Sequence, residues 1–181
     1  MIKISKKINK CRICEDYNLI DMFDFGKIAL TGTFPASKKK NINKTPLSVV
    51  FSRKSKLLQL KHNYNFKNLF GQNYGYRSGL NNSMIYHLKK KFYYLSDRVE
   101  IKPNDNILDI GSNDGTFLNF FSKNLNLIGC DPSAKKFQKF YKKNIKILYS
   151  IFDNKVINKL SYKFKLITAI AMFYDLDNPL S

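Results

Sequence analysis

The sequence predicts an α/β fold, with a parallel sheet preceded by a small loop-rich module. From residue 105 onward, short apolar runs alternate with segments of helical spacing, the pattern of strand–helix–strand units. One of these runs leads directly into a turn that contains two glycines. Residues 1–62 differ, because they combine turn-forming residues, a Cys pair and two short strand-like runs with little helical periodicity.

The expected elements divide the chain into three parts. In residues 1–62 we expect strands at 20–25 and 47–51, a Gly/Thr/Pro loop at 31–35 and a Lys/Asn-rich stretch at 38–44. Residues 63–104 read as an aromatic linker and a helix at 82–96 with one buried face. Residues 105–181 predict strands at 106–110, 125–130, 145–149 and 165–172, and helices at 114–123, 133–143 and 153–160, with Ser133 as an N-cap.

The charge is large but uneven. Of 181 residues, 32 are basic and 13 acidic, a formal charge of +19, and 28 of the basic residues are Lys. Proteins that read nucleic acid usually rely on Arg, so most of these Lys are expected on the solvated surface. Residues 1–105 carry +14, which keeps an anionic ligand, nucleic acid included, as a candidate for this half.

Two features indicate where the protein resides. No apolar run approaches the roughly 18 residues of a membrane helix, and no apolar stretch follows the basic N-terminus. Three cysteines, two of them Cys11 and Cys14 in a C-x-x-C pair, do not make a disulfide framework. We therefore expect no membrane association, and a reducing, cytoplasmic location in which the Cys pair is a candidate for a metal.

The most informative segment follows the strand expected at 106–110. Gly111 and Gly115 are four residues apart, which permits a sharp turn but differs from the G-x-G-x-x-G spacing that admits a pyrophosphate. Asp109 and Asp114 in the same segment would repel a pyrophosphate. They would suit the ammonium group of an amino-acid ligand.

The next expected strand ends at a second acidic position, Asp131, followed by Pro132. A carboxylate there, about 20 residues after the glycine turn, is suited to hold a ribose diol. S-adenosylmethionine fits this description, because it has a ribose, an amino-acid tail and no phosphate. The plainer alternative is that Asp109 and Asp131 only cap turns. The candidate cofactor residues in these two segments are Asp109, Gly111, Ser112, Asn113, Asp114, Gly115, Asp131 and Pro132.

The motifs together resemble the sugar C-methyltransferase family, whose members methylate a carbon of a nucleotide-linked hexose. The matching pieces are the Cys pair, Leu57-Leu-Gln-Leu60, the stretch Phe70-Gly-Gln-Asn-Tyr-Gly-Tyr-Arg-Ser-Gly-Leu-Asn81, the glycine turn, residues 129–133 and residues 167–179. They span the chain in the family's order.

The resemblance implies a fold, a cofactor and a substrate. The fold would be a Rossmann-like SAM-dependent methyltransferase sheet, here incomplete with about four parallel strands, preceded by a zinc-binding-type module. The aromatic stretch around Tyr76 would lie over the cofactor, and Phe152 would lie near its adenine or belong to the core. The substrate would be a nucleotide-linked sugar. In such enzymes a base creates a carbanion in line with the methyl donor.

The sequence departs from the family in two ways. The family's second Cys pair is replaced by Ser52 and Ser55, and hydroxyls are poor zinc ligands, so little or no zinc is expected. The chain also ends after the fourth expected strand, so we expect it to be truncated within the methyltransferase domain. Its activity would then be lost, or completed by a separately encoded C-terminal half or by another copy of the chain.

An alternative function is a nucleic-acid methyltransferase or a basic RNA-binding module. Enzymes that methylate amino groups of bases place Asn/Asp-Pro-Pro-aromatic after the fourth strand, whereas this chain has Asp177-Asn-Pro-Leu. The missing Pro and aromatic residue make this alternative the less favoured one.

Overall fold

The computed structural model divides the chain into two compact units, one formed by residues 1–75 and 174–181 and the other by residues 76–173. The structure describes residues 4–30, 37, 42–65, 69–70, 74–161 and 163–180. The predicted loop at 31–35, positions 38–41 of the Lys/Asn-rich stretch and positions 71–73 of the aromatic stretch lie outside the described residues.

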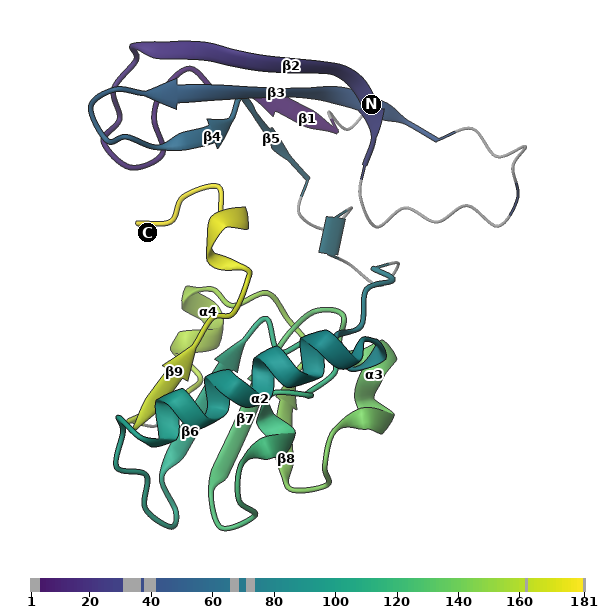
Figure 1. Cartoon of the computed structure of the whole chain (residues 1–181), viewed down its shortest axis with the longest axis vertical. Coiled ribbons are helices and arrows are strands. Elements are labelled where there is room, and N and C mark those ends of the chain that lie inside the picture. Colours follow the sequence, from purple (N-terminus) through teal and green to yellow (C-terminus); the bar gives the residue numbers. More distant parts are fainter. Residues whose placement is uncertain are drawn as a thin grey trace. The chain divides into compact units, whose positions relative to one another are not determined.

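The first unit is built from two antiparallel sheets (Figure 1). One pairs β1 (Ser5–Lys7) with β5 (His62–Tyr64), and the other has the order β2-β3-β4, formed by Leu19–Ala29, Lys44–Ser52 and Leu58–Leu60. The strands expected at 20–25 and 47–51 are therefore present and longer than predicted. β2 continues past a register shift near Gly26, whose φ of 70° and N–H bond to the Asp24 side chain accommodate the irregularity.

The second unit contains the predicted parallel sheet. Its order is β8-β7-β6-β9, formed by Ile145–Leu148, Asn126–Cys130, Asn106–Ile110 and Leu166–Thr168. All three neighbouring pairs are parallel. The α/β fold, with a parallel sheet preceded by a loop-rich module, is thereby confirmed.

Side chains alternate between the two faces of this sheet, as the period of a strand requires. Ile107, Leu127 and Ile145 belong to one buried cluster, against which Met84, Phe92 and Leu95 of α2 (Asn82–Ser96) pack. Figure 1 shows α2 crossing that face. The second cluster contains Leu108, Ile128 and Cys130, with residues in and around α4 (Asn154–Ile157) packed against it. The expected helix at 82–96 has the observed bounds, and Leu88 is its buried residue.

The prediction of a helix at 114–123 is wrong. That segment contains turns and the short 3₁₀ helix η2 (Leu118–Phe120). Gly, Thr, Asn, Ser and three Phe between 115 and 122 have low helix propensity. The Asp114 carboxylate also takes up the backbone N–H of Thr116.

The helix expected at 133–143 is shorter than predicted, because it consists of α3 (Ala134–Phe137) and η3 (Gln138–Phe140). The chain becomes extended at Tyr141, with ψ of 141°, as the Tyr141 hydroxyl turns back to donate to the carbonyl of Asn113. Ser133 precedes α3 but does not cap it, because its hydroxyl donates to Asp131 instead.

The last expected elements are also shorter. The helix at 153–160 is reduced to α4, and the strand at 165–172 to β9. Pairing with β6 ends at Asp109 and Thr168, one residue before β6 itself ends, so the later residues have no ladder to join. The remaining short elements are η1 (Ser78–Leu80) and η4 (Phe173–Asp175).

Gly115 is predicted to be important for the stability of the second unit. A Cβ at this position would lie 2.5 Å from Cδ1 of Tyr141, and its φ is 75°. We expect Gly115→Ala to lower the free energy of unfolding of this unit by about 2–4 kcal/mol, because it adds a clash to backbone strain. Hydrogen exchange under increasing urea would measure each unit separately.

Gly26→Ala is the matched control. Its φ of 70° is nearly the same, but a Cβ there would meet nothing within 4 Å. It should lower the stability of the first unit by about 1–2 kcal/mol, the cost of strain alone. Equal losses at the two positions would contradict the packing argument.

Candidate active site

The loop after β6 turns sharply because three of its residues have left-handed backbones. Gly111, Asn113 and Gly115 have φ of 74°, 49° and 75°. The N–H of Gly111 donates to the carbonyl of Cys130 at 2.8 Å, which fixes the start of the loop against the end of β7. The loop therefore lies at the carboxyl ends of β6 and β7, where ligands bind in open parallel sheets.

Asn113 joins this loop to three other segments. Its backbone N–H donates to Asp131 at 2.9 Å, and its carbonyl accepts from the Tyr141 hydroxyl at 2.9 Å. Its side chain accepts from the N–H of Ser78 at 2.9 Å and donates to the carbonyl of Tyr76 at 3.1 Å. One residue thus ties the aromatic segment, the end of β7 and the segment after α3 to the loop.

Asp114 holds the same aromatic segment by its carboxylate. This side chain is 1% exposed and accepts from the N–H of Gly79 at 2.9 Å. Arg77 forms an ion pair with it at 3.4 Å and also stacks over the ring of Phe140, 3.9 Å from its centroid. Asp114 was predicted to suit the ammonium group of a ligand. In the structure its carboxylate is bonded to donors of the chain itself.

Asp131 accepts from both sides of the turn after β7. One oxygen accepts from Asn113, and the other accepts from the N–H and the hydroxyl of Ser133, both at 2.6 Å. The residue is 8% exposed, and the following Pro132 is half-buried. Asp131 thus caps a turn in this structure. Its Oδ1 already accepts two hydrogen bonds, whereas Oδ2 accepts one and keeps a further lone pair for a ligand.

Asp109 is a buried carboxyl near the end of β6. It is 3% exposed and accepts from the Thr168 hydroxyl of β9 at 2.7 Å. Burial raises the pKa of Asp109 to about 7, and the charge of Asp131 adds to this, while the hydrogen bond from Thr168 opposes it. A carboxyl with a raised pKa at a loop of this kind is a typical feature of a functional site.

Tyr141 and Thr168 were not predicted from the sequence. The buried ring of Tyr141 packs against Gly115, and its hydroxyl contacts Ser112 at 2.9 Å. Burial raises the pKa of Tyr141 far above its ordinary value, so the hydroxyl stays a donor. No local pattern marks either residue, because each contributes through a partner at least 26 positions away.

The remaining predicted residues lie in different surroundings. Tyr76 is tethered to Asn113 by its carbonyl, and its side chain is exposed. Ser112 is buried between Tyr141 and Gly129. Phe152 is half-buried and packs on the cluster around Leu108, so the structure gives it a core contact.

The comparisons with known proteins agree with this geometry. Residues 80–181, more than half of the chain, match a family model described as "Methyltransferase domain". The chain belongs to this methyltransferase family. Residues 11–70 match a second model, described as "Putative zinc binding domain".

One relative is similar to this chain across portions of both matched regions. C-methyltransferase NovU of Streptomyces niveus is 29% identical over 136 residues, which cover 74% of this chain and 32% of the relative. The chain thus spans about a third of the length of that relative. With the two family models, this match confirms the resemblance that the motifs indicated.

No helix in the described parts of the chain is long and apolar enough to cross a membrane.

The zinc-binding match does not extend to the ligands. Cys11 lies 3.1 Å from the hydroxyl of Ser55, and Cys14 lies 3.7 Å from that of Ser52, so the four positions do converge. Structural zinc sites use four thiolate or imidazole ligands, and two of these positions carry hydroxyls. His62 supplies no substitute, because the described residues contain no group of three or more His, Cys, Asp or Glu able to hold a metal. The residues present do not fit zinc.

The thiols of the methyltransferase chain differ in their surroundings. Burial acts to raise the pKa of Cys11, but bonds from the N–H groups of Cys14 and Ile13 and from Ser55 outweigh it and lower that pKa to about 7. Cys130, at the end of β7, is buried, and burial raises its pKa to about 11. Cys130 is a core residue, as its position in a buried strand predicts.

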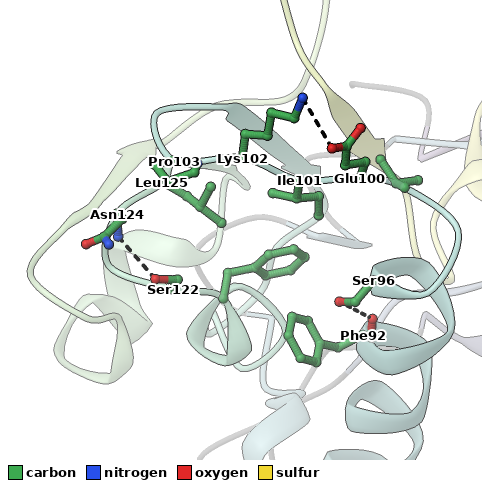
Figure 2. A pocket seen from close by; sticks show the side chains of 11 residues that line it. Phe92, Ser96, Glu100, Ile101, Lys102, Pro103, Ser122, Asn124 and Leu125 are labelled. Atoms are coloured by element: carbon green, nitrogen blue, oxygen red, sulfur yellow. Dashed lines mark hydrogen bonds and ion pairs between the residues drawn. The ribbon is translucent and has the colours of Figure 1, made fainter.

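A pocket of about 530 Å³ lies at the opposite end of the strands (Figure 2). Its lining comes from the end of α2 and from the turns that precede β6 and β7. Its polar groups pair with one another, as between Lys102 and Glu100 at 3.2 Å and between Ser96 and the carbonyl of Phe92. It is therefore separate from the loop site and offers no convergent polar groups.

Asn113→Gly is predicted to release the aromatic segment without straining the loop, because glycine tolerates a φ of 49°. Loss of the bonds to Ser78 and Tyr76 should cost about 1–2 kcal/mol and lower the exchange protection of the Ser78 amide about tenfold. The Gly79 amide, which is bonded to Asp114, should change less.

The control substitution is Asn104→Gly. Asn104 has a φ of 70° in the turn before β6, so the same change is made at another left-handed Asn. It should leave the Ser78 amide protected. Exchange at Ser78 that is unchanged in Asn113→Gly would show that the tether is absent in solution.

Proposed function

We propose that this chain binds S-adenosylmethionine at the loop after β6 and carries the methyl-donor part of a C-methyltransferase for a nucleotide-linked sugar. The observation that best supports this cofactor is that the two segments of the site carry carboxylates and no basic residue. Asp109 and Asp131 lie at the ends of adjacent parallel strands, and residues 106–122 and 126–134 contain no Lys or Arg. Such a site suits a cation and a ribose and would repel phosphate.

The roles of the residues follow from their positions. S-adenosylmethionine, when bound, supplies a methyl group activated by a sulfonium centre. Asp131 would accept from a ribose hydroxyl through its Oδ2, and Asp109 would face the positive charge of the amino-acid tail. Gly111 allows close approach of the backbone, while Tyr76 would cover the ligand and Phe152 and Pro132 would form apolar walls near the adenine.

The acceptor is inferred from similarity. The relative's name supports transfer to carbon. The order of motifs from the Cys pair to residues 167–179 resembles enzymes that act on nucleotide-linked sugars. For such a reaction the carbon nucleophile must lie in line with the methyl group, at about 3–3.5 Å. The aromatic segment held by Asn113 and Asp114 would fix one wall of that space.

Asp131→Asn is predicted to weaken binding of S-adenosylmethionine. The variant keeps one acceptor oxygen for Ser133 but removes the charge, and loss of a hydrogen bond to a charged group costs about 1.5–3 kcal/mol. Isothermal titration calorimetry would measure the change.

Glu100→Gln serves as the control, since this exposed carboxylate precedes β6 at the far end of the sheet. It should bind like the wild type. Equal affinity of Asp131→Asn and wild type would overturn the ribose assignment. An absence of binding to the wild-type chain would overturn the proposal as a whole.

The affinity should depend on pH through Asp109. Because burial raises the pKa of Asp109 to about 7, this carboxyl holds a proton in the free protein below that pH. A cationic ligand favours the charged form, so affinity should rise from pH 5.5 to 7 by up to about tenfold per unit and level off above.

The measurement is calorimetry across this pH range in buffers of different ionisation enthalpy, which also reports the proton released. Asp109→Asn cannot titrate, so its affinity should be lower and flat over the same range. Parallel pH profiles for the wild type and this variant would show that Asp109 does not face the ligand's charge.

A further inference from the structure

The structure contains two equivalent turns that face each other in the first unit. In one, the N–H of Cys11 donates to the carbonyl of Asp16 at 2.8 Å, and in the other, the N–H of Ser52 donates to the carbonyl of Leu57 at 2.9 Å. Both bonds join residue i to residue i+5, so the turns have the same length and closure.

The equivalence extends to the backbone after each pair. Cys14 is followed by Glu15 with a φ of 57°, and Ser55 is followed by Lys56 with a φ of 61°. A left-handed residue that is not glycine is uncommon, and it recurs here at matching positions. The two turns thus keep one geometry while one carries thiols and the other hydroxyls.

The side chains pair across the two turns. Cys11 meets Ser55, and Cys14 meets Ser52, through contacts of 3.1 Å and 3.7 Å. Cys11 and Ser52 are both fully buried. Cys11 and Ser52 begin their turns, and Cys14 and Ser55 occupy the fourth position of each, so the four side chains connect the two turns.

Each of the two hydroxyls has hydrogen-bond partners within the protein, without a metal. Ser52 accepts from the N–H of Ser55 at 3.4 Å, and Ser55 accepts from the N–H of Leu57 at 3.3 Å. Each hydroxyl also shares a hydrogen bond with the facing sulfur, in which either atom can be the donor, and Cys11 accepts from the N–H of Ile13 at 3.4 Å. Buried polar groups satisfied in this way need no further partner.

We propose that hydrogen bonds among Cys11, Cys14, Ser52 and Ser55 take the place of a zinc ion and that this module folds without metal. A neutral hydroxyl provides no charge to balance Zn²⁺, whereas it can form a hydrogen bond with the facing sulfur without a metal. The module also retains an antiparallel sheet of three strands, in which Val50 and Gln59 are buried. The cross-turn hydrogen bonds therefore only need to hold two turns in register on an existing sheet.

The test compares the wild-type chain with Ser52→Cys/Ser55→Cys, both purified without chelator and analysed for zinc by mass spectrometry. The wild type should contain well below one equivalent and should melt at the same temperature with and without a strong chelator. The double variant should contain about one equivalent, because four thiolates then converge, and its melting temperature should fall when the chelator is added.

Two further variants separate structure from chance binding. Ser83→Cys/Ser122→Cys adds two thiols at exposed positions of the second unit and should not acquire zinc. Ser52→Ala/Ser55→Ala removes the cross-turn hydrogen bonds and should lower the melting temperature of the first unit by about 4–8 °C for each kcal/mol lost, equally with and without chelator.

Near-stoichiometric zinc in the wild type, lost together with stability on chelation, would overturn the proposal. Failure of Ser52→Cys/Ser55→Cys to bind zinc while remaining folded would also overturn it, because the four positions would then not converge. Neither outcome bears on the binding of S-adenosylmethionine, so the two proposals can fail separately.

Discussion

The arrangement of the second unit depends on the left-handed backbone of Asn113. All four of its backbone and side-chain polar groups are bonded. Its main chain contacts Asp131 and Tyr141, and its amide contacts Ser78 and Tyr76. A left-handed conformation costs a non-glycine residue about 1–2 kcal/mol, less for Asn, and four hydrogen bonds offset that cost. Three segments far apart in the sequence are thereby fixed on one residue.

This constraint assigns different tasks to the acidic residues of the loop. Asp114 is bonded to Gly79 and paired with Arg77, so it anchors the wall of the site. Asp109 is buried against Thr168, with a pKa raised by burial. Asp131 shapes the turn after β7. The proposed cofactor would therefore meet a pocket wall and two carboxylates that the hydrogen-bond network has already positioned.

The first unit has two turns of matching backbone geometry, but only one of them carries the thiols that zinc requires. The turns at 11–16 and 52–57 keep matching closures and matching left-handed residues. Both turns lie within the residues that match a zinc-binding model, whereas the capacity for zinc depends on the four side-chain atoms that the turns bring together. With two hydroxyls among them, the same backbone is suited to hydrogen bonds.

Sequence alone determined the elements whose signals are local. The strand at 106–110 and the helix at 82–96 have the predicted bounds, since an apolar run and a one-sided apolar face are enough to specify burial. It also identified the glycine turn, the two strand-end carboxylates and the Cys pair. The tertiary structure decided what those residues contact. The helix expected at 114–123 gave way to turns, and the one expected at 133–143 was cut short where Tyr141 turns back to Asn113. Such outcomes depend on partners distant along the chain, and only the folded path brings those partners within hydrogen-bonding distance.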